Sequence, residues 1–400
     1  MALPLDLSAR SAAREQAYWT AWVATLIFFA GFYALLIPLP RYLELSGLAD
    51  WQIGLVLGAF GIAALVGRPV AGLAADRWGP QPVLLGGSVA LTLGALGVGF
   101  TTSLPLLFGL RLLQAAGYVA FTTASTALII TLSPAEERGR RLAIFGTAAN
   151  VAIVLSPAAI GLLLGYIPLT GAFWLSAGLA GLAGALMVAG GGRDGQAGKQ
   201  ASGPTPGARP AVRRADLLSF APRRLWLPMG ALAIGGLGFG AFFQFAPILA
   251  DRRGGVEAAL LYSVYGVGII AARLLGGRWL DQTGIARVVG IAFGLTACGL
   301  GLMAVADQAI WLCFAALLTA IGSGLFHPAL LAQHARLLPD EPGRASAAAY
   351  IGFDLGLGLG GWLLGLVLQF GGLGALYGVA AVVVLGGLPV AFMLDRSTLR

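Results

Sequence analysis

The feature that most constrains this chain is a series of long, uninterrupted apolar segments. They lie near residues 18–38, 52–73, 81–101, 104–131, 141–167, 170–191, 225–249, 258–280, 286–305, 309–336, 344–370 and 372–394. Each is as long as the roughly 20 residues that a helix needs to cross the hydrocarbon core of a bilayer. Lipid leaves only helices or a closed barrel, and these segments do not alternate as barrel strands do. The sequence therefore predicts twelve membrane-spanning helices.

Composition supports a membrane environment. Hydrophobic residues make up 58% of the chain and charged residues 10%, with a mean hydropathy of +0.86, which excludes an ordinary soluble protein. The first segment follows a long polar stretch, exceeds a signal-peptide core in length and lacks a small-residue cleavage site. We therefore expect it to be a span and not a secretion signal.

The second half of the chain repeats the first. Four residues recur at an offset of 205, and one further pair matches after a slip of one residue. The pairs are Arg68 and Arg273, Gly72 and Gly277, Asp76 and Asp281, Gly79 and Gly284, then Asn150 and Asp354. Parallel repeats of six spans enclose a site near the bilayer midplane. We expect an all-α integral membrane protein: a six-helix bundle at 1–191, a basic linker at 192–224 and a second six-helix bundle at 225–400.

Basic residues predict the orientation. With both termini in the cytoplasm, nineteen of the 25 basic residues face inside, and three (Arg41, Arg252 and Arg253) face outside. This asymmetry predicts a multi-pass protein of the cytoplasmic, inner membrane. The pI of about 10.0 then reflects topology, and we expect no nucleic-acid partner.

The connection between the second and third spans resembles a family signature. Gly72, Asp76, Arg77 and Gly79 fit the pattern Gly-x-x-x-Asp-Arg-x-Gly of the major facilitator superfamily, and the likeness covers essentially all 400 residues. Pro80 and Gln81 stand where that family has basic residues. The resemblance implies a transporter that works by alternating access.

The resemblance also implies a gate on the cytoplasmic side, without substrate contact. The residues expected in it are Arg68, Gly72, Asp76, Arg77, Gly79, Arg273, Gly277, Asp281 and Gly284. Glycines in spans allow close helix approach, glycines in connections suit tight turns, and a carboxylate at a helix end can accept backbone N–H groups or pair with arginine. The alternative is that these are ordinary loop residues.

The fourth and fifth spans resemble the family less closely. Arg111 and Gln114 fit an Arg-x-x-Gln-Gly-x-Gly stretch in which Ala115 replaces the first glycine, and Ser156-Pro157 partly fits the Gly-Pro-x-x-Gly pattern of the family's antiporters. An arginine within a span is costly unless it has a partner or a wet cavity. Arg111 is therefore expected either to take part in proton coupling or anion attraction, or to extend to the outer interface.

Asp354 is the one acid of seventeen that lies well inside a span, about 15 Å from Arg344 at 1.5 Å per residue. Burial disfavours the charged form of a carboxyl group, which suits reversible protonation. We expect Asp354 to carry a coupling proton; the alternative is a carboxylate that caps a glycine-rich bend. His327 is a second candidate proton site, with a packing role as its alternative.

Polar and aromatic residues within the spans are the candidates for substrate binding, because a side chain with a polar tip prefers a wet cavity. They are Tyr33, Gln114, Tyr118, Asn150, Gln244, Phe243 and Tyr265. Cys298 and Cys313 belong to no motif, and His327 and His334 have no further ligand at metal-binding spacing. We expect no metal and no cofactor.

No phosphate-binding loop or nucleophile elbow occurs, so we expect a transporter and not an enzyme. The main prediction is a monomeric secondary active transporter in the lipid bilayer that exports small amphipathic organic molecules in exchange for protons. One alternative is symport or facilitated uptake of a small organic acid or sugar. A second alternative is a non-transporting receptor or scaffold on the same fold.

Overall fold

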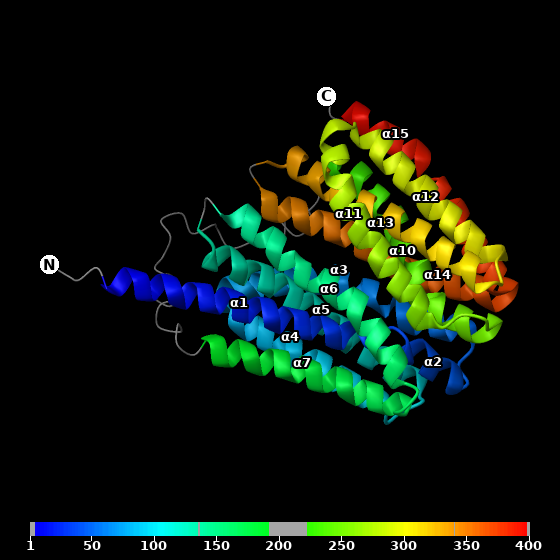
Figure 1. Cartoon of the computed structure of the whole chain (residues 1–400), viewed down its shortest axis with the longest axis horizontal. Helices are drawn as coiled ribbons and strands as arrows, with labels where there is room; N and C mark the ends of the chain where they lie inside the picture. The colour runs from blue at the N-terminus through cyan, green and yellow to red at the C-terminus, as the bar shows by residue number, and fades with distance from the viewer. Residues whose placement is uncertain (1–4, 135–136, 192–221, 340, 398–400) are drawn as a thin grey trace.

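The computed structural model describes residues 5–134, 137–191, 222–339 and 341–397, and its regular structure is helical (Figure 1). The first half contains α1 (Leu5–Tyr33), α2 (Pro38–Leu45), α3 (Asp50–Trp78), α4 (Pro80–Val98), α5 (Leu104–Leu132), α6 (Arg138–Leu163) and α7 (Leu169–Gly191). The second half contains α10 (Arg223–Arg253), α11 (Ala258–Gln282), α12 (Ile285–Val305), α13 (Ala309–Leu337), α14 (Pro342–Leu385) and α15 (Leu388–Ser397). Most of the expected linker, residues 192–221, lies outside the described residues.

Ten helical segments among the described residues are long and apolar enough to cross a membrane. The apolar part of α11 is shorter than in these ten segments and covers Ala258–Leu274. α14 has 44 residues and is interrupted at Gly372, whose φ of 70° is a left-handed conformation that glycine adopts without strain. The expected number of twelve spans stays a prediction.

Helices α1–α7 pack mainly on one another, and so do α10–α15. The two halves meet mainly where α3 packs on α14 and where α6 packs on α11 (Figure 1). They are in contact at the end of the molecule that holds α2, and they draw apart toward the end that holds the N-terminus (Figure 1).

Glycines allow α3 and α14 to approach closely. A Cβ added at Gly54 would lie 2.6 Å from the Cα of Gly365, and one added at Gly61 would lie 2.7 Å from the Cα of Gly358. Both distances are too short for any side chain. Beyond Gly61 the approach of α3 to α14 is less close, and a Cβ at Gly72 would meet no atom within 4 Å. The close contact between the halves is therefore confined to the α2 end and the middle of the molecule.

The two copies of the repeated motif differ in their turns. Gly79, between α3 and α4, has a φ of 85°, as a turn that requires glycine would have. Gly284, its counterpart, has a φ of −58°. Gly284 therefore lies in the short connection between α11 and α12, as expected, but in a conformation that any residue can adopt.

Candidate functional site

The centre of the molecule holds an ion pair that joins the two halves. Both Nε and Nη2 of Arg68, on α3, lie 2.6 Å from Oδ2 of Asp354, on α14. The side chains are 10% and 4% exposed, and the Arg68 guanidinium also lies over the Tyr350 ring, 4.7 Å from its centroid. Asp354 does not cap a bend, since α14 is helical around it. A buried carboxylate and its cation thus hold α3 and α14 together.

A second polar contact joins α6 and α11. Nη1 of Arg273 donates a hydrogen bond to Oδ1 of Asn150, whereas Nε of Arg273 is buried without a partner. Asn150 is neutral, so this contact lacks the charge compensation that Asp354 gives to Arg68. Both arginines interact electrostatically with Tyr350 and with His327, so the two contacts belong to one central site.

The sequence repeat explains the arrangement. Arg68 and Arg273 are equivalent positions of the two halves, and so are Asn150 and Asp354. In each contact an arginine of one half binds a polar residue of the other half: Arg68 binds Asp354, and Arg273 binds Asn150. The two contacts therefore occupy equivalent positions in the sequence repeat, but only the first contains an acidic residue.

Aromatic rings surround these polar groups in both halves. In the first half Tyr118 lies near three rings, with centroids 5.6 Å from Phe29, 4.4 Å from Phe32 and 5.2 Å from Phe60, and Tyr33 lies 5.6 Å from Phe29. In the second half Phe239 contacts Phe243 at 4.1 Å, Phe353 at 5.2 Å and Tyr265 at 6.2 Å. His327 lies 5.1 Å from Phe353 and 5.8 Å from Tyr350.

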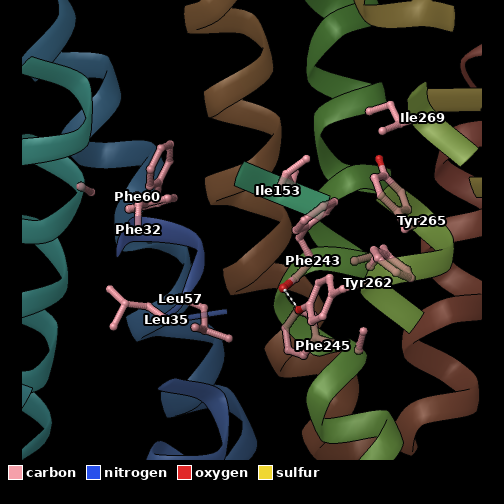
Figure 2. Close-up of a cluster of buried hydrophobic side chains, with 14 of the residues drawn as sticks. Phe32, Leu35, Leu57, Phe60, Ile153, Phe243, Phe245, Tyr262, Tyr265 and Ile269 are labelled. Carbon is pink, nitrogen blue, oxygen red and sulfur yellow. Dashed lines mark hydrogen bonds between the residues drawn. The ribbon is translucent and has the colours of Figure 1, made fainter. Parts of the chain in front are cut away.

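Figure 2 shows part of these aromatic clusters, with Phe32 and Phe60 on one side, Phe243 and Tyr265 on the other, and Ile153 of α6 between them in this view. The hydroxyl of Tyr262 donates to the backbone oxygen of Phe243 at 2.8 Å. That bond fixes the Tyr262 ring within its own half. Tyr265 makes no such bond to the backbone of the described residues, and its buried Oη lies near the Ser323 hydroxyl.

Arg111 lies within the first half. It is 7% exposed, donates from Nη1 to Oε1 of Gln114 at 3.0 Å, and lies over the Phe32 ring at 5.7 Å. Gln114 in turn donates to the backbone oxygen of Gly94 at 2.9 Å. Among the described residues no carboxylate neutralises Arg111. This part of the site is therefore also positively charged.

Other predicted residues lie outside the central group. Gln244 is 6% exposed and donates to the backbone oxygen of Leu357 at 3.1 Å, so it links α10 to α14 within one half. Asp76 and Arg77 are exposed and make no ion pair with the described residues. The surroundings of Gly277 and the side chain of Asp281 are outside what the structure describes, so the proposed gate stays a prediction.

Sequence reasoning placed Arg68 and Arg273 in the gate motif and omitted Tyr350 and Phe353. A signal was available: three arginines, Arg68, Arg111 and Arg273, fall within spans against one acid, Asp354. Charges inside a membrane protein tend to pair or to line a cavity. Counting them together would have indicated that Asp354 pairs with one of the three arginines, without saying which.

A further set of ion pairs joins the halves at the α2 end. Arg41 donates to both carboxylate oxygens of Asp251, at 2.6 and 2.5 Å. Arg252 donates to Glu44 at 2.6 Å and to both oxygens of Asp50. These residues come from α2, α3 and the end of α10, so they close this end of the molecule.

A charged site buried among apolar helices, and shared by two repeated halves, defines a polytopic membrane transporter. The family model described as Major Facilitator Superfamily matches residues 21–256 and 254–400. The chain belongs to this family, and it is a transporter and not an enzyme.

Relatives and solved structures agree with this assignment. The MFS-type transporter YhhS of Escherichia coli K12 is 28% identical over 385 residues, which cover 92% of this chain and 90% of that protein. The nucleoside transporter NupG superposes with a TM-score of 0.74 at 14% identity, covering 95% and 99% of the two chains. The human organic anion transporter MFSD10 gives 0.67 at 17% identity, covering 94% and 99%. A bacterial homologue of the human lysosomal transporter Spinster, in an inward-facing conformation, gives 0.73 at 15% identity, covering 97% and 98%.

Proposed function

We propose that the chain is a proton-coupled secondary transporter of small amphipathic organic molecules, in which Asp354 carries the coupling proton. The observation that carries this proposal is the Arg68–Asp354 ion pair between the halves. Protonation of the carboxyl group removes its charge, frees Arg68 and weakens the contact of α3 with α14. Proton binding therefore changes the stability of the conformation in which the halves meet at the α2 end.

The proposal includes an architecture of twelve spans in two six-helix bundles. α14 is long enough, at about 66 Å for 44 residues at 1.5 Å each, to supply two passes separated at Gly372. With both termini in the cytoplasm, the α2 end is the outer end of the protein. Its ion pairs and close glycine contacts then correspond to a state closed to the outside.

The direction of coupling follows from the charge of the substrate. A cation would bind the Asp354 carboxylate, compete with the proton and so be exchanged for it. An anion would need Arg68 free of Asp354, would bind together with the proton and would travel in the same direction. Export in exchange for protons is favoured by the partial match of Ser156-Pro157 to the pattern of the family's antiporters. Symport is favoured by Arg111 and Arg273, which have no acidic partner among the described residues.

The test is transport by purified protein in proteoliposomes, with an imposed pH gradient and a panel of small aromatic acids, amides and amines. We expect the pH gradient to drive accumulation of at least one compound in the wild-type protein. Asp354→Asn should abolish this driven accumulation. Simultaneous recording of proton flux separates symport from exchange by its sign. Unimpaired pH-driven transport in Asp354→Asn would refute the proposed role.

A further inference from the structure

Arg273 is a cation without an acidic partner among the described residues. A guanidinium group has five N–H donors. Arg273 uses Nη1 on the neutral amide of Asn150, and its Nε is buried without a partner. A buried cation that is not compensated is expensive. An arriving anion would supply both the missing charge and the missing acceptor.

Further donors lie beside it. The Tyr265 hydroxyl interacts electrostatically with Arg273, and the Ser323 hydroxyl lies near that of Tyr265. Tyr265 is 0% exposed and Ser323 is 2% exposed, and apart from each other the two hydroxyls have no hydrogen-bond partner among the described residues. Figure 2 shows the Tyr265 hydroxyl pointing toward Ile269, which lies one turn further along α11. These groups provide hydrogen bonds for a planar acidic group next to the guanidinium.

We infer that Arg273, Tyr265 and Asn150 form a subsite for the carboxylate of an aromatic or other apolar organic acid. This inference rests on the proposed function, because it names the substrate class of the same central site. Phe239 contacts Tyr265 on one side and Phe353 on the other. The apolar part of the acid therefore has an aromatic surface directly beside the position of its carboxylate.

Asn150 determines the charge of this subsite. Its equivalent in the other half, Asp354, neutralises Arg68, and Asn150 leaves Arg273 positive. Asn150→Asp should therefore reproduce the compensated pair of the other half and remove the positive charge that the acid needs. This variant keeps the size and shape of the side chain, so it tests charge alone.

The experiment measures ligand-dependent thermal stabilisation of detergent-purified protein, with benzoate as the probe and with benzamide and benzylamine as matched neutral and cationic controls. We expect benzoate to stabilise the wild-type protein and the two controls not to do so. Arg273→Gln and Asn150→Asp should each raise the apparent Kd for benzoate at least tenfold, the effect of losing a charge-assisted hydrogen bond. Arg140→Gln, which removes an arginine whose side chain is 74% exposed, should leave the Kd unchanged.

Asn150→Asp keeps the inference testable if Arg273→Gln does not fold. Because Asn150→Asp compensates Arg273, we expect this variant to unfold at a higher temperature than the wild type in the absence of ligand. The inference is overturned if benzoate does not stabilise the wild type, or if either variant binds it as tightly as the wild type. The subsite alone is refuted if pH-driven transport requires Asp354 but Arg273→Gln binds benzoate as tightly as the wild type. The proton-carrying role of Asp354 alone is refuted if benzoate binding follows the expected pattern but Asp354→Asn shows normal pH-driven transport.

Discussion

Asp354→Asn is expected to destabilise the protein by about 3–5 kcal/mol, the cost of leaving one member of a buried ion pair uncompensated. The structure supports this magnitude because the side chains of Arg68 and Asp354 are only 10% and 4% exposed. Two charges about 4 Å apart interact by about 4 kcal/mol at an effective dielectric constant of about 20. The variant retains the shape of the side chain and removes its charge.

Arg68→Gln should cost less than Asp354→Asn. An arginine cannot release its proton within a protein, whereas a carboxyl group left alone can take up a proton and become neutral. The cost of Arg68→Gln should therefore fall further as the pH is lowered. The double variant leaves no charge at this position and should regain most of the stability that Asp354→Asn loses.

The assay is reversible unfolding of purified protein by sodium dodecyl sulfate in mixed micelles, followed by circular dichroism. Asp307→Asn is the control, because Asp307 is 81% exposed and lies 3.6 Å from Arg253, so its loss should change stability by less than about 1 kcal/mol. A double-mutant cycle gives the coupling energy of the pair. If the losses of the two single variants simply add in the double variant, the ion pair does not hold the halves together.

Three further predictions concern the contacts between the halves and the remaining buried arginine. Gly61→Ala should reduce transport at least tenfold, because its Cβ would lie 2.7 Å from the Cα of Gly358, whereas Gly178→Ala, with no neighbouring atom within 4 Å, should transport normally. Arg252→Gln should increase labelling of a cysteine introduced between the halves at the α2 end, since Glu44 and Asp50 lose their shared partner, and 1 M salt should have a similar effect on the wild type. Arg111→Gln should lower transport more than Arg111→Lys, which retains the charge, and equal activities would show that charge at this position is not required.

The apolar helices and most of their boundaries followed closely from the sequence, because lipid permits few structures and hydrophobicity marks them directly. The expected segment 52–73 lies within α3, and 309–336 lies within α13. The expected start of the first span, residue 18, was late, since α1 begins at Leu5. A polar helical extension outside the apolar stretch has no hydrophobic signal that could reveal it.

The partners of the site residues could not be predicted from the sequence in the same way. Arg68 and Asp354 are 286 residues apart, and no periodicity within either span indicates which residue of another span it will face. Tyr350 and Phe353 entered the site only through the position of α14 against α3. The repeat contained more information than the spans alone, because it placed Asn150 opposite Asp354 in the alignment of the halves.

The three basic residues expected outside are exceptions to the inward preference of positive charge, and the structure gives each of them a partner. Arg41 binds Asp251, Arg252 binds Glu44 and Asp50, and Arg253 donates to backbone oxygens near the end of α12. Arg41 and Arg252 connect α2 and α3 to α10, and therefore join the two halves. If the predicted orientation is right, Arg41 and Arg252 are positive charges on the disfavoured side that stabilise contact between the halves. At the centre, Arg68 likewise has an acidic partner in the other half, Asp354, and among the described residues Arg273 has only the neutral Asn150. Contact at the α2 end thus rests on paired charges, whereas the carboxylate subsite that we propose uses the charge of Arg273, which has no acidic partner among the described residues.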